Sequence, residues 1–126
     1  MPKTVPVLEG MAPSPLPFSR VVEANGFVFL AGQVGDAPGG DGPAEGGIEA
    51  ETRAMLDNVR RLLRAVELDL DDVVRSTVYL VDFDEFAAMN AVYREYFPHD
   101  PPARATVGVT RLASTYRVEI EITAAR

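Results

Sequence analysis

The segment FVFLAGQV at residues 27–34 is apolar on both of the faces that a β-strand presents. Side chains alternate along a strand, which assigns Phe27, Phe29 and Ala31 to one face and Val28, Leu30 and Val34 to the other. A second segment, VVRSTVYLV at 73–81, is also largely apolar on both faces. A sheet that contains two such strands needs cover on both sides, so this chain cannot fold into a sheet with one face left in water.

Two amphipathic helices are predicted to cover one of these faces. The clearer one spans residues 48–67, where apolar side chains recur with the 3.6-residue period of an α-helix. The second spans residues 83–97 and ends before Pro98, because proline cannot continue a helix. The apolar stripe predicted for this second helix consists of Phe83, Phe86, Ala87, Tyr93 and Phe97.

Asn90 falls on the same apolar stripe of the second helix. An amide in that position must find partners, because an unpaired buried amide costs about 1–3 kcal/mol. Two interpretations remain open at this point. Asn90 either bonds to backbone in a structural role or helps to shape a site.

The remaining strands complete an α+β pattern. Asn25-Gly26 is the sequence of a tight hairpin turn between two apolar runs. The predicted strands lie at about 20–24, 27–34, 73–81, 103–109 and 117–124. The order β-β-α-β-α-β-β predicts one α+β domain over residues 1–126, with a mostly antiparallel sheet and both helices on one face. We expect the second apolar face of the sheet to meet another copy of the chain.

Glycine and proline mark the irregular parts of the chain. Residues 1–19 contain five prolines and are predicted to form an extended arm or an edge strand, because proline cannot donate to a central ladder. Residues 35–47 are too rich in glycine and proline for regular structure. The acids at 69–72 lack the pattern of an EF-hand and are interpreted as a turn with capping carboxylates.

Composition excludes several kinds of chemistry. The 126 residues contain no Cys, and His99 is the one histidine, so neither a thiol nucleophile nor a zinc site built from several histidines is available in one chain. The one lysine, Lys3, lies too close to the N-terminus to suit a desolvated Schiff base. The net charge of −7 argues against nucleic acid and anionic membranes as partners. With no long apolar run at the N-terminus, we expect a cytoplasmic protein.

Arg104 and Glu119 are the strongest candidates for chemistry. Arg104 follows the rigid Pro101-Pro102 pair and opens a predicted strand, and Glu119 lies in the last strand. If these strands are neighbours, an arginine that can clamp a carboxylate and an acid that can deprotonate water lie on one face. The alternative is a surface ion pair, which the spacing alone favours. Alternation places Glu121 on the same face as Glu119 and does not choose between them.

Several segments together resemble the RidA/YjgF family of small trimeric imine deaminases. The segments are AGQV at 31–34, LDNVRRLL at 56–63, DDVVRSTVYLVDFDEFAAMNAVYREYF at 71–97, PPARATVGVTRL at 101–112 and VEIEITA at 118–124. The combination of the PAR motif with an E-I-E strand some fifteen residues later is the most specific part. The resemblance runs nearly end to end.

The resemblance implies a fold, an assembly and an activity. The fold is similar to that of trimeric bacterial chorismate mutase, with three subunits that pack their sheets inward and a cleft at each subunit boundary. The implied activity is hydrolysis of reactive enamines and imines, such as 2-aminoacrylate, to 2-keto acids and ammonia. The resemblance implies no metal and no organic cofactor. A carboxylate-bearing imine is the implied substrate, and a homotrimer is the implied assembly.

Five positions of this sequence match the family's site. Arg104 matches the arginine that grips the substrate carboxylate, and Glu119 matches the acid that positions the attacking water. Thr106 stands where the family often has Cys, at a position whose backbone contacts the ligand. Gly32 and Asn90 match residues that form the pocket.

Two positions depart from the family pattern. Phe18 replaces a Tyr and Ala31 replaces a Ser that are often found in the most active subgroup. Both replacements remove hydroxyl groups, and each lost hydrogen bond is expected to cost about 0.5–1.5 kcal/mol of transition-state stabilisation.

The sequence therefore supports a hydrolytic imine and enamine deaminase as the main hypothesis. Two alternatives stay open: a non-catalytic trimer that binds carboxylates, as a metabolite sensor or a chaperone-like surface, and a pathway-specific deaminase similar to aminomuconate deaminases. Ribonuclease activity has been associated with relatives, but the charge of −7 and the lone His99 make it an unattractive interpretation here.

Overall fold

The computed structural model describes residues 2–126, and it contains the strands and helices in the predicted order. The elements are β1 (Val21–Ala24), β2 (Phe27–Val34), α1 (Gly47–Ala65), η1 (Leu70–Asp72), β3 (Val73–Leu80), η2 (Phe83–Glu85), α2 (Phe86–Tyr96), β4 (Ala103–Gly108) and β5 (Val118–Ala125). The two elements named η are single turns of 3₁₀-helix. The bounds of the five strands and of the two α-helices agree with the predicted segments to within a few residues.

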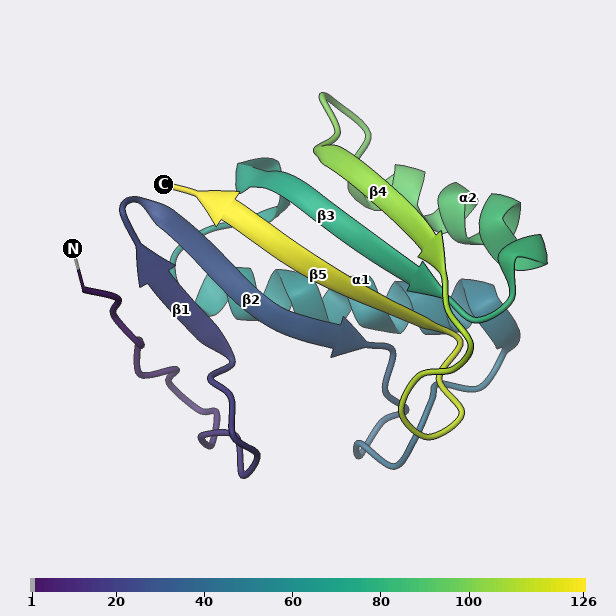
Figure 1. The fold of residues 1–126 in the computed structure, drawn as a ribbon, viewed down its shortest axis with the longest axis horizontal. Coiled ribbons are helices and arrows are strands. Elements are labelled where there is room, and N and C mark those ends of the chain that lie inside the picture. Colours follow the sequence, from purple (N-terminus) through teal and green to yellow (C-terminus); the bar gives the residue numbers. More distant parts are fainter. Residues whose placement is uncertain (1) are drawn as a thin grey trace.

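The five strands form one mixed sheet in the order β1-β2-β5-β3-β4. Three of the four neighbouring pairs are antiparallel, and β3 pairs with β4 in parallel. Both helices lie against the same face of this sheet (Figure 1). The predicted α+β architecture, a mostly antiparallel sheet with two helices on one face, is confirmed. The position of β4 differs from the simplest expectation, because β3 lies between it and β5.

The hydrophobic core lies between the sheet and the helices. The helix-facing residues of β5, which are Val118, Ile120 and Ile122, are buried, as is the apolar face of α1. The side chains of Met55 and Val78 are completely buried in the same cluster. Within residues 2–126, no helix has the length and apolar character that a membrane span requires.

Local sequence signals account for the turns. Asn25 and Gly26 both have positive φ, 53° and 81°, as a two-residue hairpin turn of the predicted type requires. The acids at 69–72 cap the short helix η1: the Asp69 side chain accepts from the Leu70 N–H, and the Asp72 side chain accepts from the Asp69 N–H. The interpretation of these acids as capping residues is confirmed.

The predicted apolar stripe of the second helix is confirmed in part. Tyr93 and Phe97 are buried and Phe86 packs against the core, whereas Phe83 is 48% exposed and Ala87 is exposed. Met89 and Val92, which the predicted stripe did not include, are buried as well. Phe83 lies in a 3₁₀ turn, which has three residues per turn, so the α-helical period does not extend back to it. Asn90 stays beside the buried stripe, half-buried.

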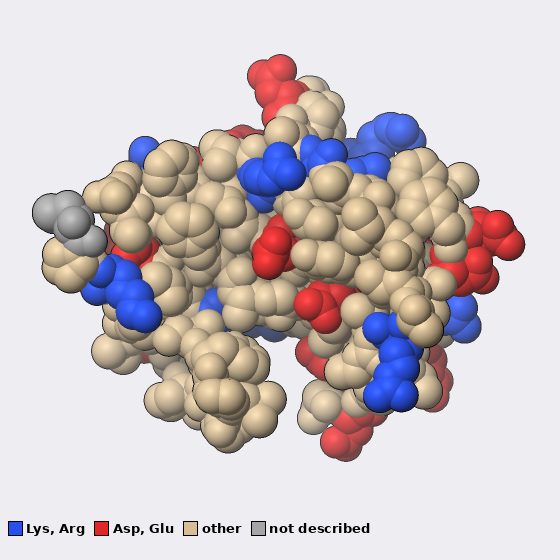
Figure 2. All heavy atoms as spheres, in the orientation of Figure 1, with Lys and Arg blue, Asp and Glu red and all other residues tan. Residues whose placement is uncertain are grey.

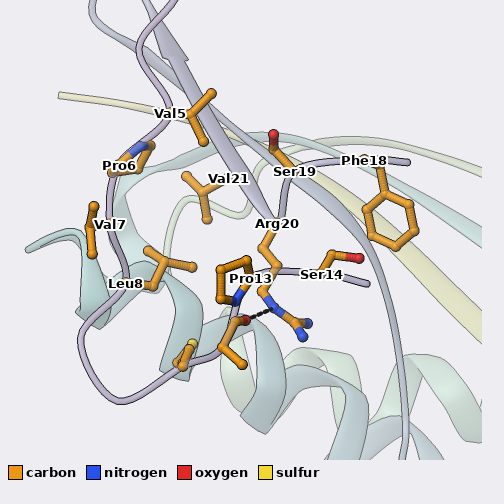
Figure 3. Close-up of a pocket in the computed structure, with 12 residues that line it drawn as sticks. Val5, Pro6, Val7, Leu8, Pro13, Ser14, Phe18, Ser19, Arg20 and Val21 are labelled. Carbon is orange, nitrogen blue, oxygen red and sulfur yellow. Dashed lines mark hydrogen bonds between the residues drawn. The ribbon is translucent and has the colours of Figure 1, made fainter. Parts of the chain in front are cut away.

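The N-terminal segment runs as an extended arm beside β1. It is joined to the edge of the sheet by one isolated bridge, in which Thr4 and Glu23 exchange both backbone hydrogen bonds at 2.8 Å. The arm and the start of β1 enclose a cavity of about 380 Å³, lined mainly by apolar side chains (Figure 3). The Nε of Arg20 donates to the carbonyl of Ala12 at 3.0 Å and ties the arm back on itself.

The face of the sheet opposite the helices is uncovered in the single chain. Large apolar side chains lie exposed along it, including Phe27 at 45%, Phe29 at 43% and Val107 at 40%. Figure 2 shows this face as largely uncharged over the central strands, apart from a few acidic side chains near its centre and basic side chains above them. An apolar surface of this kind is typical of an interface between subunits.

Candidate active site

Arg104 is presented on an aromatic surface at the edge of the sheet. Its guanidinium carbon lies 4.6 Å from the centre of the Tyr93 ring and 5.8 Å from that of Phe86. Tyr93 is itself fixed, because its hydroxyl shares a hydrogen bond of 2.8 Å with the buried Ser76 hydroxyl. Burial raises the pKa of the Tyr93 hydroxyl, so the ring stays neutral and holds the cation through its π face.

The guanidinium opens onto a cavity at the C-terminal end of α2. This cavity has a volume of about 410 Å³, and Asn90, Tyr93 and Arg104 lie in its wall together with the turn at 98–102. Among residues 2–126, no carboxylate lies within ion-pair distance of Arg104. The cation is therefore available for an external anion, and a guanidinium can bind a carboxylate through two parallel hydrogen bonds.

Two polar atoms near Arg104 lack partners in the chain. The side-chain oxygens of Asn90 and Thr106 are buried and make no hydrogen bond within the described residues. Thr106 follows Arg104 by two positions on β4, so both side chains point to the same side of the strand. The interpretation of Asn90 as a structural amide bonded to backbone is not supported at its oxygen, which has no partner within residues 2–126. Unpaired polar atoms of this kind are expected where a ligand completes the hydrogen bonding.

Glu119 lies on the other, uncovered face of the sheet. Its neighbours Val118 and Ile120 are buried under the helices, so alternation points Glu119 away from them. Burial, and more weakly the carboxylate of Glu121, raises the pKa of the Glu119 carboxyl above its usual range. A carboxylate with a raised pKa is a better proton acceptor than an ordinary surface acid.

The absence of a side chain at Gly32 leaves room for the Glu119 carboxylate. A Cβ atom at position 32 would fall well inside van der Waals distance of the carboxylate oxygen Oε2 of Glu119. Strand β2 carries a bulge between Leu30 and Gln33, and Gly32 lies within it. The bulge and the missing side chain together let the carboxylate lie directly over the backbone of β2.

Phe18 and Ala31 belong to the same end of β2 as Gly32. The Ala31 N–H donates to the carbonyl of Arg20 at 2.9 Å, which places the end of the arm beside this part of the strand. The side chain of Phe18 is 51% exposed at the rim of the arm cavity (Figure 3).

Within one chain, the seven predicted site residues therefore form two separate groups. Arg104 pairs in register with Ser76, which pairs with Ile122, whereas Glu119 pairs with Tyr79. Directly opposed residues share a face of a sheet, so Arg104 is on the helix side and Glu119 is on the uncovered side. The condition under which both groups would lie on one face, that β4 and β5 are neighbours, is not met, because β3 lies between them. We call the groups the arginine half-site (Arg104, Thr106 and Asn90) and the carboxylate half-site (Glu119, Gly32 and Ala31), to which we add Phe18 because the end of the arm meets β2 at Ala31.

Tyr93 is the site residue that the sequence did not reveal. It was assigned to the apolar stripe of the second helix, and its ring is indeed buried. The signal that could have identified it is its spacing, because position i+3 on a helix lies on the same side as Asn90. His99 lies exposed in the turn after α2, and residues 2–126 contain no cluster of three potential metal ligands.

Comparison with known proteins shows which sequences this chain is similar to. Residues 10–126 match the family model described as Endoribonuclease L-PSP. The chain is 42% identical to a RutC family protein of Pyrococcus horikoshii, over 87% of this chain and 88% of the relative. It is 36% identical to the 2-iminobutanoate/2-iminopropanoate deaminase of Mus musculus, over 83% and 78% of the two chains.

Solved structures show the same fold. The crystal structure of RidA from an Antarctic Psychrobacter matches with a TM-score of 0.83 and 31% identity, over 91% of this chain and 94% of that one. The E. coli TdcF structure with bound serine matches with a TM-score of 0.81 and 32% identity, over 90% and 91%. Fold and sequence thus define an α+β protein of the chorismate-mutase-like type. The chain belongs to the RidA/YjgF/L-PSP family, which includes the RutC proteins.

Proposed function

We propose that this protein hydrolyses reactive imines and enamines of 2-amino acids to 2-keto acids and ammonia, without a cofactor. The observation that carries the proposal is the Arg104 guanidinium, which is held over Tyr93, faces a cavity and has no carboxylate partner within residues 2–126. Relatives named as 2-iminobutanoate/2-iminopropanoate deaminases support the reaction class.

In the proposed mechanism, Arg104 binds the substrate carboxylate and fixes the adjacent imine carbon next to a water molecule. Glu119 accepts a proton from that water while the water oxygen attacks the imine carbon. The electron pair of the C=N bond moves to nitrogen, and Glu119 returns the proton to that nitrogen to give a carbinolamine. In the collapse, Glu119 takes the proton of the carbinolamine hydroxyl and passes it to the amine nitrogen, so that the C=O bond forms while the C–N bond breaks and ammonia leaves. An enamine enters the same route after protonation at its β-carbon.

The two half-sites require a second copy of the chain. They lie on opposite faces of one sheet, so we propose a homotrimer in which the arginine half-site of one subunit meets the carboxylate half-site of the next. The uncovered face with its exposed Phe27 and Phe29 supports this assembly, because it offers an apolar surface for the contact. Substrate then binds in a cleft at each subunit boundary.

A non-catalytic carboxylate-binding trimer is the second candidate. Phe18 and Ala31 favour it, because both lack the hydroxyls that could bond to substrate or water. A neighbour crystallised with bound serine is compatible with either function. RNA is a poorer ligand for this chain, because its net charge is −7 and its one histidine, His99, is exposed in a turn.

A coupled assay tests the proposal. An amino-acid oxidase generates imines from several amino acids, and semicarbazide traps what remains after the purified protein is added. We expect the wild-type protein to suppress trapping and the Arg104→Ala variant to have no effect. If no imine is consumed while 2-keto acids still raise the melting temperature, the binding function replaces the catalytic one.

A further inference from the structure

Glu51 is a buried acid that the proposed mechanism does not use. It lies in the second turn of α1 with 1% of its surface exposed. One carboxylate oxygen, Oε2, accepts hydrogen bonds from two consecutive backbone N–H groups, those of Arg117 at 2.6 Å and Val118 at 3.2 Å. These are the two residues that precede Glu119.

The Glu51 carboxylate accepts the hydrogen bonds that a neighbouring strand would otherwise accept from the start of β5. Strand β2 ends at Val34, which pairs with Glu119, so the N–H groups of residues 117 and 118 lie beyond the last pair of the β2–β5 ladder. Buried N–H groups at the end of a ladder need an acceptor from elsewhere. The Glu51 side chain, which reaches over from α1, supplies it.

Glu51 also contacts the chain that leaves β2. A Cβ atom at Gly35 would fall well inside van der Waals distance of the Glu51 carbonyl oxygen. The exit of β2 therefore passes directly over the helix at this residue. Gly35 lies three residues after Gly32, which accommodates the Glu119 carboxylate, so one helical residue holds both strand ends that surround Glu119.

Among residues 2–126, no cation makes a direct ion pair with Glu51. The Arg117 guanidinium is engaged with Glu85 of η2 at 2.8 Å, and the hydroxyl of Tyr116 is bonded to Asp36. Burial raises the pKa of the Glu51 carboxyl, while the two backbone N–H bonds and the more distant Arg117 charge lower it and the Glu85 charge raises it. A neutral amide would accept the same two hydrogen bonds without the cost of burying a charge.

We propose that Glu51 is a positioning residue, whose side chain fixes the start of β5 and so sets where the Glu119 carboxylate lies. The expected effect of Glu51 on kinetics rests on the proposed function, whereas its structural role does not. The positioning role requires a side chain as long as that of Glu51 with an oxygen acceptor at its end, and it does not require the negative charge.

Two variants separate length from charge. Glu51→Gln keeps the length and the acceptor but removes the charge, and Glu51→Asp keeps the charge but withdraws the oxygens by one methylene. Thr52→Val is the matched control, because Thr52 is equally buried on the same helix and its hydroxyl has no partner within residues 2–126. We expect all three proteins to fold, as checked by circular dichroism and thermal melting.

The kinetic test compares kcat with KM for imine hydrolysis. We expect Glu51→Asp to lower kcat by about tenfold or more while KM stays within about twofold, because a displaced base loses alignment and Arg104 still binds the carboxylate. Glu51→Gln and Thr52→Val are expected to stay within about threefold of the wild type in both constants. A kcat for Glu51→Asp equal to that of the control, or a loss in Glu51→Gln as large as in Glu51→Asp, overturns the proposal.

A second readout does not depend on activity. Carbon-13 NMR of the side-chain carboxyls follows the titration of Glu119, whose resonance is identified by its absence in Glu119→Gln. We expect the Glu119 titration to be the same in the wild type, Glu51→Gln and Thr52→Val, and to move in Glu51→Asp toward that of an ordinary exposed glutamate. An unchanged titration in Glu51→Asp contradicts the positioning role. If the wild type shows no turnover, the proposed function fails, and this titration still decides the role of Glu51.

Discussion

Arg104 and Glu119 lie on opposite faces of the same sheet, with strand β3 between the strands that carry them. Each of the two side chains is held by a different neighbour in the chain. Arg104 lies over the ring of Tyr93, and Glu119 lies against the backbone of Gly32. Any reaction that needs both groups at one substrate therefore needs two copies of the chain.

The first prediction is that two inactive variants restore each other when mixed. Arg104→Ala and Glu119→Gln are each expected to be inactive alone, but a site between subunits can pair the intact half of one with the intact half of the other. Random reassembly of equal amounts into trimers gives an intact pair at about a quarter of the boundaries. We therefore expect about a quarter of the wild-type activity after joint refolding.

The control is a mixture of Arg104→Ala with a chain that carries both substitutions. It contains no intact arginine half-site and is expected to stay inactive. If the first mixture is equally inactive while size-exclusion chromatography shows mixed oligomers, the site is contained in one subunit.

Removal of the Arg104 guanidinium is the second test. We expect Arg104→Ala to lose activity without loss of fold, and Arg104→Lys to recover little of it, because an ammonium cannot make the planar two-point contact with a carboxylate. Loss of such a charged contact corresponds to about 1.5–3 kcal/mol, or about a 10- to 150-fold drop in kcat/KM. Arg111→Ala, at an exposed loop residue, is the control and should behave as the wild type. Undiminished turnover by Arg104→Ala would remove the assignment.

The third prediction concerns Gly32. In Gly32→Ala, the added methyl group occupies the place of a Glu119 carboxylate oxygen, so the carboxylate must move. The backbone at this position does not require glycine, since its φ is not positive. We expect a folded protein whose kcat falls by about tenfold or more. Gly108→Ala is the control, because the nearest atom to its added Cβ lies at 3.6 Å, an ordinary contact. Equal kcat values for the two variants would show that the place of the carboxylate is unimportant.

The fourth prediction is a dependence on pH. Glu119 accepts a proton only as a carboxylate, so activity should rise with pH through its pKa, which burial places above the usual 4.5. Because the folded-state pKa is raised, the contribution of this group to stability is present below 4.5 and is lost as the pH rises through the raised value. We therefore expect Glu119→Gln to melt no lower than the wild type at pH 7 while being inactive. A clear drop in its melting temperature at pH 7 would contradict this account.

The fifth prediction restores the missing hydroxyls. Phe18→Tyr and Ala31→Ser each add one group that can bond to substrate or to the attacking water. At about 0.5–1.5 kcal/mol per hydrogen bond, we expect kcat/KM for small imines to rise about two- to tenfold for each substitution. The measurement is the same coupled assay with imines of different side-chain size. A loss for small imines in both variants would show that the wild-type pocket is adapted to its two apolar residues.

Much of the fold could be predicted from the sequence because the signals are local. The hairpin at Asn25-Gly26 depends on two adjacent residues that accept positive φ, and α1 depends on a regular apolar period. The start of α2 could not be predicted in the same way. Tyr93 and Phe97 are buried as the period predicts, but the 3₁₀ turn at Phe83–Glu85 precedes the α-helix and leaves Phe83 exposed.

The sequence identified the individual residues of the candidate site, but it did not predict that Arg104 and Glu119 lie on opposite faces of the sheet. Contacts between residues far apart in the chain decide which strands pair. The alternation of side chains within β4 and β5 therefore does not reveal that β3 lies between them. The bulge in β2 is a further case. It places Val34 opposite Glu119, on the face away from the helices, whereas simple alternation assigned it to the same face as Leu30.

The two half-sites are under different constraints. Arg104 lies on a buried ring, so most substitutions around it also destabilise the core, and Glu119 lies on a face that another subunit is expected to cover. Phe18 is on the arm and is 51% exposed, so a substitution there disturbs few packed neighbours. We therefore expect evolutionary change in ligand preference to accumulate in the arm, while Arg104 and Glu119 stay fixed.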